Sequence, residues 1–556
     1  MVAPMRAAYE WIRQGLPVYD AHHGFYLLPL VGIALVAARH LVVRAGRGAR
    51  TGRVPAVARG VLFTILVAAA LLSVVVYNNF FNYHYTGYLN AYEFFHYYLG
   101  SKYAPEVGYF DLYGAALAAD GETGRVFWPA DGRMTDLRTH RLVPVADVLA
   151  EEGRRRARFS PDRWREWVQD VSFFKQRMGA AAWNRVLRDK GYNATPAWTW
   201  VGGSLSSRVP TSSAGGMLAL ALLDACLLAG AACCVGWAFG AWPALLSLVF
   251  LASSYLMAHV HMKGAFLRTD FVVCLVVAIC MMRKGLPAVA GALVGYSAMT
   301  RLFPALFLFG PAVRALVEFS AAVRRPAAGT TTAGERIRGA LSRLDVRHAR
   351  FFGGFAVSIA LLSIGSAHHA GGIEAWSRFA RKISVHRADY HPWNVGLPSV
   401  VAAEFEAGRP VLPAGAVERR GWTLGLIQLA AVAACAYAAR GLAGHRALAF
   451  GFVPTFFLVA PTYYYYIVLL VPFVFLAERL DRVTGALGLA YLFFFGLAGH
   501  VLYQRWEQQF PTYYGNSLLA LGLALYVLAV GLRESARADS GVFPRRDAGG
   551  TAEARS

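Results

Sequence analysis

Charge, and acidic charge most of all, is scarce in this sequence. Only 16% of the residues are charged, and 33 Asp and Glu stand against 55 Lys and Arg. All six cysteines lie inside apolar runs without zinc-like spacing, so neither a disulfide framework nor a metal site is indicated. We find no GxxxxGK followed by Ser or Thr, no GxGxxG after a strand and no HExxH. Their absence argues against a soluble nucleotide-driven mechanism.

Long apolar runs are abundant in this sequence. The sequence is 56% hydrophobic, with a mean hydropathy of +0.40. Runs long enough to cross a bilayer recur, and they predict an all-α polytopic membrane protein with about 13 transmembrane helices. The first run begins near Gly24 and has no small-residue cleavage site before Arg44, so we expect no cleavable signal peptide. The expected spans lie near 24–43, 60–79, 214–236, 241–260, 266–282, 286–300, 302–317, 352–367, 422–440, 447–461, 463–477, 484–502 and 516–533.

The formal net charge of +22 is explained by topology rather than by a nucleic-acid partner. Basic residues gather in short loops between apolar runs, and such loops face the cytoplasm. The predicted location is therefore the cell (inner) membrane, multi-pass, with large extracytoplasmic loops. The predicted parts are 1–59, with the first span and a basic loop; 60–317, a membrane module with outer loop 80–213; 318–350, a basic cytoplasmic loop; 351–535, a second membrane module with outer loop 367–420; and 536–556, a disordered tail.

The stretch NAYEFFHYYLGSKY follows the second span and is dense in polar groups. Glu93 and His96 are three residues apart and so share one helix face, with Asn90 one turn earlier. A carboxylate beside imidazole and amide groups can act as general base towards a hydroxyl. An interfacial aromatic belt would explain the tyrosines, but not these residues together with Lys102. We predict Glu93 as the catalytic residue; weaker competitors are Glu106, Asp111 and Asp120.

A second polar segment, HVHMKGAFLRTDF, lies between two apolar runs. Its Lys263 and Arg268, next to Asp270, suit a phosphate, because cations in a partly dehydrated site are strong anion ligands. A plain positively charged loop is an equally good interpretation. The segment also contains His259 and His261, but without a third ligand they predict no metal site.

Arg301 lies at the predicted tip of a hairpin, because Lys284 and Arg314 on either side of it are both expected in the cytoplasm. Re-entrant shapes of this kind build substrate sites in membrane proteins, although an arginine at an interface can also merely snorkel. Substrate binding is the favoured interpretation. Asp224, in the middle of an apolar span, is expected to be structural and far from the outer cluster.

Two later outer loops combine aromatic rings with amide and cationic neighbours. One contains His391 and Asn394, and the other contains Tyr463 and Tyr464 within a run of four tyrosines. Such platforms suit sugar binding, and they suit a membrane interface equally well.

The order of these motifs resembles the GT-C superfamily of integral-membrane glycosyltransferases, and most closely the bacterial polyprenol-phosphate-mannose-dependent mannosyltransferases. Glu93 followed by FFHYYLGSKY resembles the acidic residue and aromatic segment of their first outer loop. GALVGYSAMTRLFP resembles their glycine-rich hairpin, with Arg301 where lysine is usual. NVGLPS at Asn394 and APTYYYYIVLLVP resemble two later segments of the family, and the likeness covers roughly 60–535.

The resemblance implies a GT-C-like fold and a hexosyltransferase that uses a polyprenyl-phosphate-linked sugar donor at the extracytoplasmic face. Glu93 would deprotonate an acceptor hydroxyl on a glycan or glycolipid, and Arg301, helped by Lys263 or Arg268, would hold the departing lipid phosphate. No cofactor is implied, and a divalent metal is not indicated. The alternatives are a transporter or flippase, which would favour ionisable groups near the bilayer midplane, and a lipid-linked phosphotransferase or polymer ligase.

Overall fold

The computed structural model describes residues 21–46, 53–84, 87–123, 132–257, 262–325, 332–387 and 390–539. The expectations for His259 and His261, for the first 20 residues and for the tail from 540 onward lie outside these ranges. Within them the chain is overwhelmingly helical. Two short antiparallel hairpins complete it: β1 (Arg133–Thr135) pairs with β2 (Leu142–Pro144), and β3 (Glu404–Glu406) pairs with β4 (Arg409–Val411).

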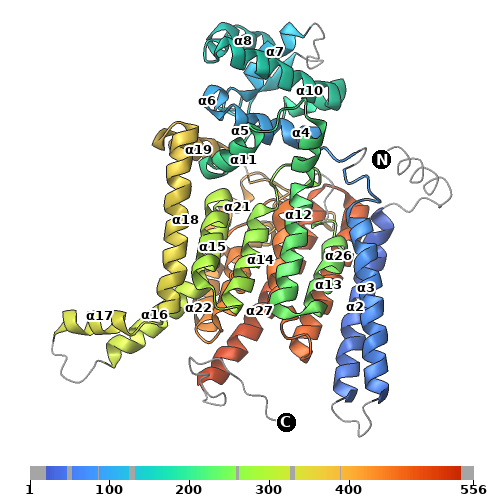
Figure 1. The fold of residues 1–556 in the computed structure, drawn as a ribbon, viewed down its shortest axis with the longest axis vertical. Coiled ribbons are helices and arrows are strands. Elements are labelled where there is room, and N and C mark those ends of the chain that lie inside the picture. The colour runs from blue at the N-terminus through green and yellow to red at the C-terminus, as the bar shows by residue number, and fades with distance from the viewer. Residues whose placement is uncertain are drawn as a thin grey trace.

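The segment predicted as the first outer loop folds into a layer of mostly short helices around the long α10 (Pro161–Val186), here called the cap (Figure 1). Its core is aromatic, with Trp167, Trp183 and Trp198 fully buried. Large rings bury much apolar area per residue, which lets a layer of short helices form a core. The helical elements of the cap are α4 (Ala91–Phe94), the π-helical turn η1 (Phe95–Leu99), α5 (Gly100–Lys102), α6 (Ala104–Val107), α7 (Leu112–Glu122), α8 (Val145–Leu149), α9 (Glu152–Arg156), α10 (Pro161–Val186) and α11 (Pro196–Ser206).

Long apolar helices form a bundle beneath the cap (Figure 1). Among the described residues, eight helical segments are long and apolar enough to cross a membrane, so the chain is a polytopic helical membrane protein. These segments are α2 (Ala21–Gly46), α3 (Arg53–Tyr77), α12 (Ala214–Phe239), η3 (Phe303–Leu308) continued by α16 (Phe309–Arg324), α18 (Val346–Ala370), α22 (Gly421–Ala439), α26 (Val483–Trp506) and α27 (Phe510–Asp539).

The other expected spans form shorter helices, so the count of 13 stays a prediction. Polar residues end two of them early: Ser253 follows α13, and Thr269 and Asp270 begin α14. The shorter elements are α13 (Ala241–Ala252), α14 (Asp270–Arg283), α15 (Pro287–Arg301), α23 (Gly444–Ala449), α24 (Phe452–Leu458), η4 (Tyr463–Leu469) and α25 (Leu470–Ala477).

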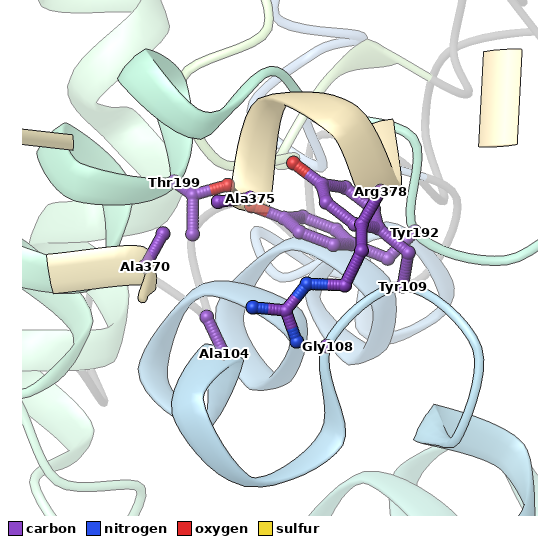
Figure 2. Close-up of a pocket in the computed structure, with 8 residues that line it drawn as sticks. All are labelled: Ala104, Gly108, Tyr109, Tyr192, Thr199, Ala370, Ala375 and Arg378. Carbon is purple, nitrogen blue, oxygen red and sulfur yellow. Dashed lines mark hydrogen bonds between the residues drawn. The ribbon is translucent and has the colours of Figure 1, made fainter. Parts of the chain in front are cut away.

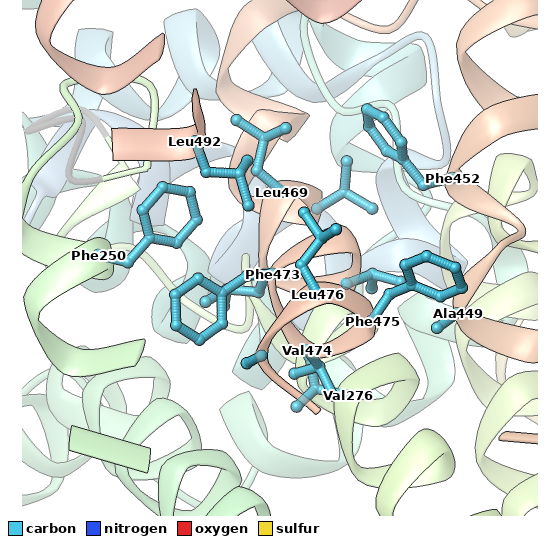
Figure 3. Close-up of a cluster of buried hydrophobic side chains, with 14 of the residues drawn as sticks. Phe250, Val276, Ala449, Phe452, Leu469, Phe473, Val474, Phe475, Leu476 and Leu492 are labelled. Carbon is cyan, nitrogen blue, oxygen red and sulfur yellow. The ribbon is translucent and has the colours of Figure 1, made fainter. Parts of the chain in front are cut away.

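Helix α25 occupies the centre of the bundle core (Figure 3). All of its residues are buried, because its sequence LVPFVFLA is apolar on every side. Phe473 stacks on Phe250 with ring centroids 5.1 Å apart. Helix α20 (Leu397–Val401) contributes Leu397 to this core. The remaining helices are α17 (Ala333–Ser342), α19 (Ile373–Arg387) and α21 (Ala416–Arg419).

Candidate active site

Glu93 is placed by a hydrogen-bonded turn that joins the cap to the bundle. Asn90 caps helix α4, because its side-chain oxygen accepts a hydrogen bond from the Glu93 backbone N–H at 3.2 Å. The backbone N–H of Asn90 donates to the carbonyl of Gly264, at 2.9 Å, in the segment that leads to Arg268. Gly264 has a φ of +65°, and a Cβ there would lie 2.1 Å from the carbonyl oxygen of Tyr88. Only glycine fits this close approach.

Arg268 is held by a buried carboxylate from the bundle. Asp224 of α12 accepts hydrogen bonds from the backbone N–H of Arg268 at 2.8 Å, and from the N–H and hydroxyl of Thr269 at 2.9 and 2.8 Å. The expectation that Asp224 lies far from the site is therefore wrong, although its role is indeed structural. Its three acceptor contacts explain how an acidic residue is tolerated inside an apolar helix.

Arg301 ends α15 and turns back towards the same segment. Its guanidinium donates to the carbonyl of Leu267 at 3.0 Å, and to that of Thr300 at 3.1 Å. It lies 3.7 Å from the carboxylate of Asp270, the first residue of α14. Asp270 also accepts a hydrogen bond from the hydroxyl of Tyr296 at 2.8 Å.

Glu93, Arg268, Asp270 and Arg301 form a compact group that we call the junction cluster. Arg268 Nε lies 3.4 Å from Glu93 Oε2, and the side chains of Arg268, Arg301 and Asp270 are at most 5% exposed. Five buried polar atoms of this group have no hydrogen-bond partner within the described part of the chain: Glu93 Oε2, Arg268 Nε, Arg268 Nη1, Asp270 Oδ1 and Arg301 Nε. Buried polar atoms are nearly always satisfied, so this concentration marks a place that a polar ligand or water completes.

Aromatic rings wall the junction cluster. Tyr97 lies 4.0 Å from the Arg268 guanidinium carbon, and Tyr464 lies 5.8 Å from it on another element. Trp198 of the cap lies 5.7 Å from Arg301. Rings beside guanidinium groups form a surface suited to the apolar faces of a sugar ring.

The electrostatics favour a carboxyl with enhanced basicity. Burial raises the pKa of Glu93 above its ordinary value; Arg268 offsets part of that rise, and Asp189 adds to it. Burial also lowers the pKa of Lys263 to about 7. Lys263, the residue before Gly264, places its ammonium 4.7 Å from the ring centroid of Tyr77. It therefore lies in the segment that leads to Arg268.

Two other predicted residues of the stretch NAYEFFHYYLGSKY, His96 and Lys102, lie within the cap. The imidazole of His96 is 2.8 Å from the Tyr113 hydroxyl, and burial lowers its pKa to about 4. Lys102 forms ion pairs of 2.7 Å with both Asp170 and Glu166. Between Glu93 and His96 the helix changes from α to π at Phe95. The side chains of His96 and Lys102 therefore make contacts within the cap, which helix periodicity alone does not reveal.

The competing acidic residues are all engaged in cap ion pairs. Although burial alone would raise it, Arg138, Arg158 and Arg155 together hold the pKa of Asp111 below its usual value. Glu106 pairs with Arg163 at 2.9 Å, and Asp120 pairs with Lys175. Of these acidic residues and Glu93, it is Glu93 that lies beside Arg268 in the junction cluster.

The two later loops meet each other beside the cluster. Asn394 accepts a hydrogen bond from the Thr462 hydroxyl at 3.3 Å, and the Tyr463 N–H donates to the Trp393 carbonyl at 3.0 Å. His391 packs on Trp393, with ring centroids 4.7 Å apart. Through Tyr464 this pair of loops reaches Arg268.

A pocket lies between the cap and helices α18 and α19 (Figure 2). Tyr109, Tyr192, Thr199 and Arg378 line it, and Tyr192 packs edge-on against Tyr97 with centroids 5.7 Å apart. Two aromatic side chains therefore separate this pocket from the junction cluster.

Sequence reasoning missed Tyr97 and Trp198 as wall residues. Tyr97 stands within the same aromatic stretch, which is a usable signal, whereas nothing in the sequence near Trp198 points to Arg301. For metals, no group of three or more His, Cys, Asp or Glu with suitable geometry occurs among the residues that the structure describes.

The fold and the site define a polytopic membrane protein with a charged, aromatic-walled cluster at the junction of cap and bundle. No protein-family model matches the chain, and searches of curated proteins and of solved structures find no significant match.

Proposed function

We propose that the protein is a polyprenyl-phosphate-sugar-dependent glycosyltransferase of GT-C type. It moves a mannose-like hexose, or a pentose, to an acceptor hydroxyl of a glycan or glycolipid at the extracytoplasmic membrane face. The observation that supports this most is the junction cluster, where two buried arginines have unpaired donor atoms. One of them, Arg268, lies 3.4 Å from the carboxylate of Glu93, whose pKa is raised by burial. Guanidinium groups suit a phosphate, and such a carboxyl suits proton abstraction.

In the proposed reaction Glu93 takes the proton from the acceptor hydroxyl. The hydroxyl oxygen attacks the anomeric carbon of the donor sugar, and the bond from that carbon to the phosphate oxygen breaks. The polyprenyl phosphate leaves with the electron pair and gains one negative charge. Arg301 and Arg268 stabilise this charge, with Lys263 close by, and the rings of Tyr97 and Tyr464 flank the sugar.

The location of the cluster fits a lipid-linked donor. It lies where the cap meets the ends of α14 and α15, so a phosphate could reach it while its polyprenyl chain stays among the membrane helices (Figure 1). The proposal also includes about 13 spans in total and a cap that lies outside the cell.

The decisive experiment uses the full chain in lipid nanodiscs with radiolabelled polyprenyl-phosphate mannose or arabinose and a hydroxyl acceptor. Transfer of label by the parent protein and its loss in Glu93→Gln support the proposal. Glu122→Gln makes the same chemical change at a cap carboxylate paired with Arg156, and should retain activity. Movement of the lipid across vesicles without any consumption would instead favour a flippase.

Sidedness has its own test. Two variants each add one cysteine to the parent chain at an exposed residue, Ala157→Cys in the cap and Ser342→Cys at the opposite end. The unsubstituted parent, with its six native cysteines, gives the background labelling to subtract. An impermeant maleimide on intact cells should label the first and spare the second. Equal labelling would overturn the extracytoplasmic placement while leaving the transfer assay unaffected.

A further inference from the structure

The end of the bundle opposite the cap carries a helix that projects from the body. Helix α17 runs across the view in Figure 1, whereas α18 and α15 run along it, and α17 lies beside the lower end of α18. Its chief contacts are with α16. A helix at right angles to the spans, at their end, has the orientation of one lying in a membrane surface.

The residues of α17 are arranged for such a position. Ile337 and Leu341 are one helical turn apart and therefore share a face, and they are 47% and 55% exposed. Arg336 and Arg338 precede and follow Ile337, so they lie about 100° to either side of this apolar stripe. Arginine stems can cover apolar surface while their guanidinium groups reach the headgroup layer.

The surrounding charge is strongly positive. The three acidic residues of α16, α17 and the start of α18 are already engaged. Glu318 pairs with Arg314 and His348. Glu335 closes a capping box with Thr332, and Asp345 caps α18 and pairs with Arg347. The arginines of this region outnumber its acidic residues. Those that are exposed in this region are Arg324, Arg325, Arg336, Arg338, Arg343, Arg347 and Arg350.

We propose that α17 and its flanking arginines form a binding surface for anionic phospholipid headgroups, with α17 lying in the interface of the leaflet opposite the cap. The exposed apolar stripe provides the insertion, and the excess of arginine provides the attraction to negative charge. The inference concerns a surface remote from the junction cluster and does not depend on the glycosyltransferase proposal.

The test measures backbone hydrogen exchange of residues 332–343 in the full chain. The protein is placed in nanodiscs of phosphatidylcholine alone, or with about 30% phosphatidylglycerol to supply negative surface charge. Exchange should slow by at least about threefold in the anionic discs, since each arginine near an anionic surface adds to the attraction. The slowing should disappear at about 1 M salt, where charges are screened within a few ångströms.

Variants separate charge from folding. The triple variant R336Q/R338Q/R343Q should lose the lipid-dependent slowing, while R336K/R338K/R343K keeps the charge and should retain it. Three exposed cap arginines provide a control with the same loss of charge, as R141Q/R188Q/R208Q, which should behave like the parent. Equal exchange in both kinds of disc overturns the proposal. Slowing that instead follows protein concentration also overturns it, because a second copy or an acidic protein would then be the partner.

Discussion

Helix α14 connects two charged groups that could hardly differ more in their pairing. Its first residue, Asp270, belongs to the junction cluster, and its last, Arg283, belongs to what we call the distal cluster. In the distal cluster Arg446 is 2.9 Å from both Glu478 and Glu534, and Arg479 lies 2.5 Å from Glu534. His445 lies 3.0 Å from Glu478, which also pairs with Arg283.

The distal cluster is closed, and the junction cluster is open. Within the described part of the chain, none of the buried side-chain atoms of the distal cluster lacks a hydrogen-bond partner, whereas five atoms of the junction cluster do. Ion pairs of 3.4 and 3.7 Å at the junction contrast with those of 3.0 Å or less at the distal end. A closed network holds helices together, while an open one retains bonding capacity for a ligand.

The largest expected effect breaks the closed cluster. Arg446→Ala removes the one arginine that pairs with both Glu478 and Glu534, which are partly buried, and should lower the free energy of unfolding by about 3–5 kcal/mol. Thermal unfolding in detergent measures this. Arg446→Met, which keeps much of the volume, should be nearly as damaging. If Arg301→Ala lowers the melting temperature just as much, the distinction between closed and open clusters is wrong.

Removing an arginine from the open cluster should instead impair donor use. Arg301→Ala removes a desolvated cation from the proposed phosphate site and should weaken donor use by about 2–5 kcal/mol. Arg301→Lys should restore part of it, because the charge remains. Transfer rates as a function of donor concentration provide the measurement. Arg505→Ala, at an exposed arginine beside Trp506, serves as the control and should behave like the parent.

Glu93→Gln sharpens the comparison by removing the proposed base while keeping the shape of the side chain. Turnover should fall about 100-fold or more, with donor and acceptor binding little changed, as expected for a group used in the transition state. Asp111→Asn should do much less to turnover, because Asp111 serves cap ion pairs. In the parent protein the base is ionised only above its pKa, and burial raises the pKa of Glu93. The rate should therefore decline with falling pH at values above the usual glutamate range.

The smallest effect concerns the support of the open cluster. Thr269→Val removes one of the three hydrogen bonds to Asp224 and should raise the KM for the donor about tenfold with little change in kcat, by displacing Arg268. Thr269→Ser keeps the hydroxyl and should match the parent. A fall in melting temperature with an unchanged KM would show that the contact serves stability alone.

Hydropathy predicted the helical membrane class and the segment of the cap, since both depend on local composition. It did not give helix lengths, because those depend on polar residues such as Ser253 and Thr269 at helix ends. Likewise Glu93, Arg268, Asp270 and Arg301 were selected by charge near apolar runs, and the structure does bring them together. The partnership of Asp224 with the Arg268 backbone could not be predicted, because it joins residues far apart in the chain through main-chain atoms. The ion pair between Lys102 and Asp170 could not be predicted either.

The glycine at position 264 has a consequence for how this chain can vary. Its missing side chain lets the segment before Arg268 pack against Tyr88 and bond to Asn90, so one backbone contact sets the spacing between Glu93 and the arginines of the junction cluster. The Cβ of an alanine there would collide with main chain rather than with a movable side chain, so the segments around Tyr88 and Gly264 would have to move apart. We expect diverging relatives that keep the same chemistry to tolerate lysine for arginine and tryptophan for tyrosine, but to keep glycine at position 264.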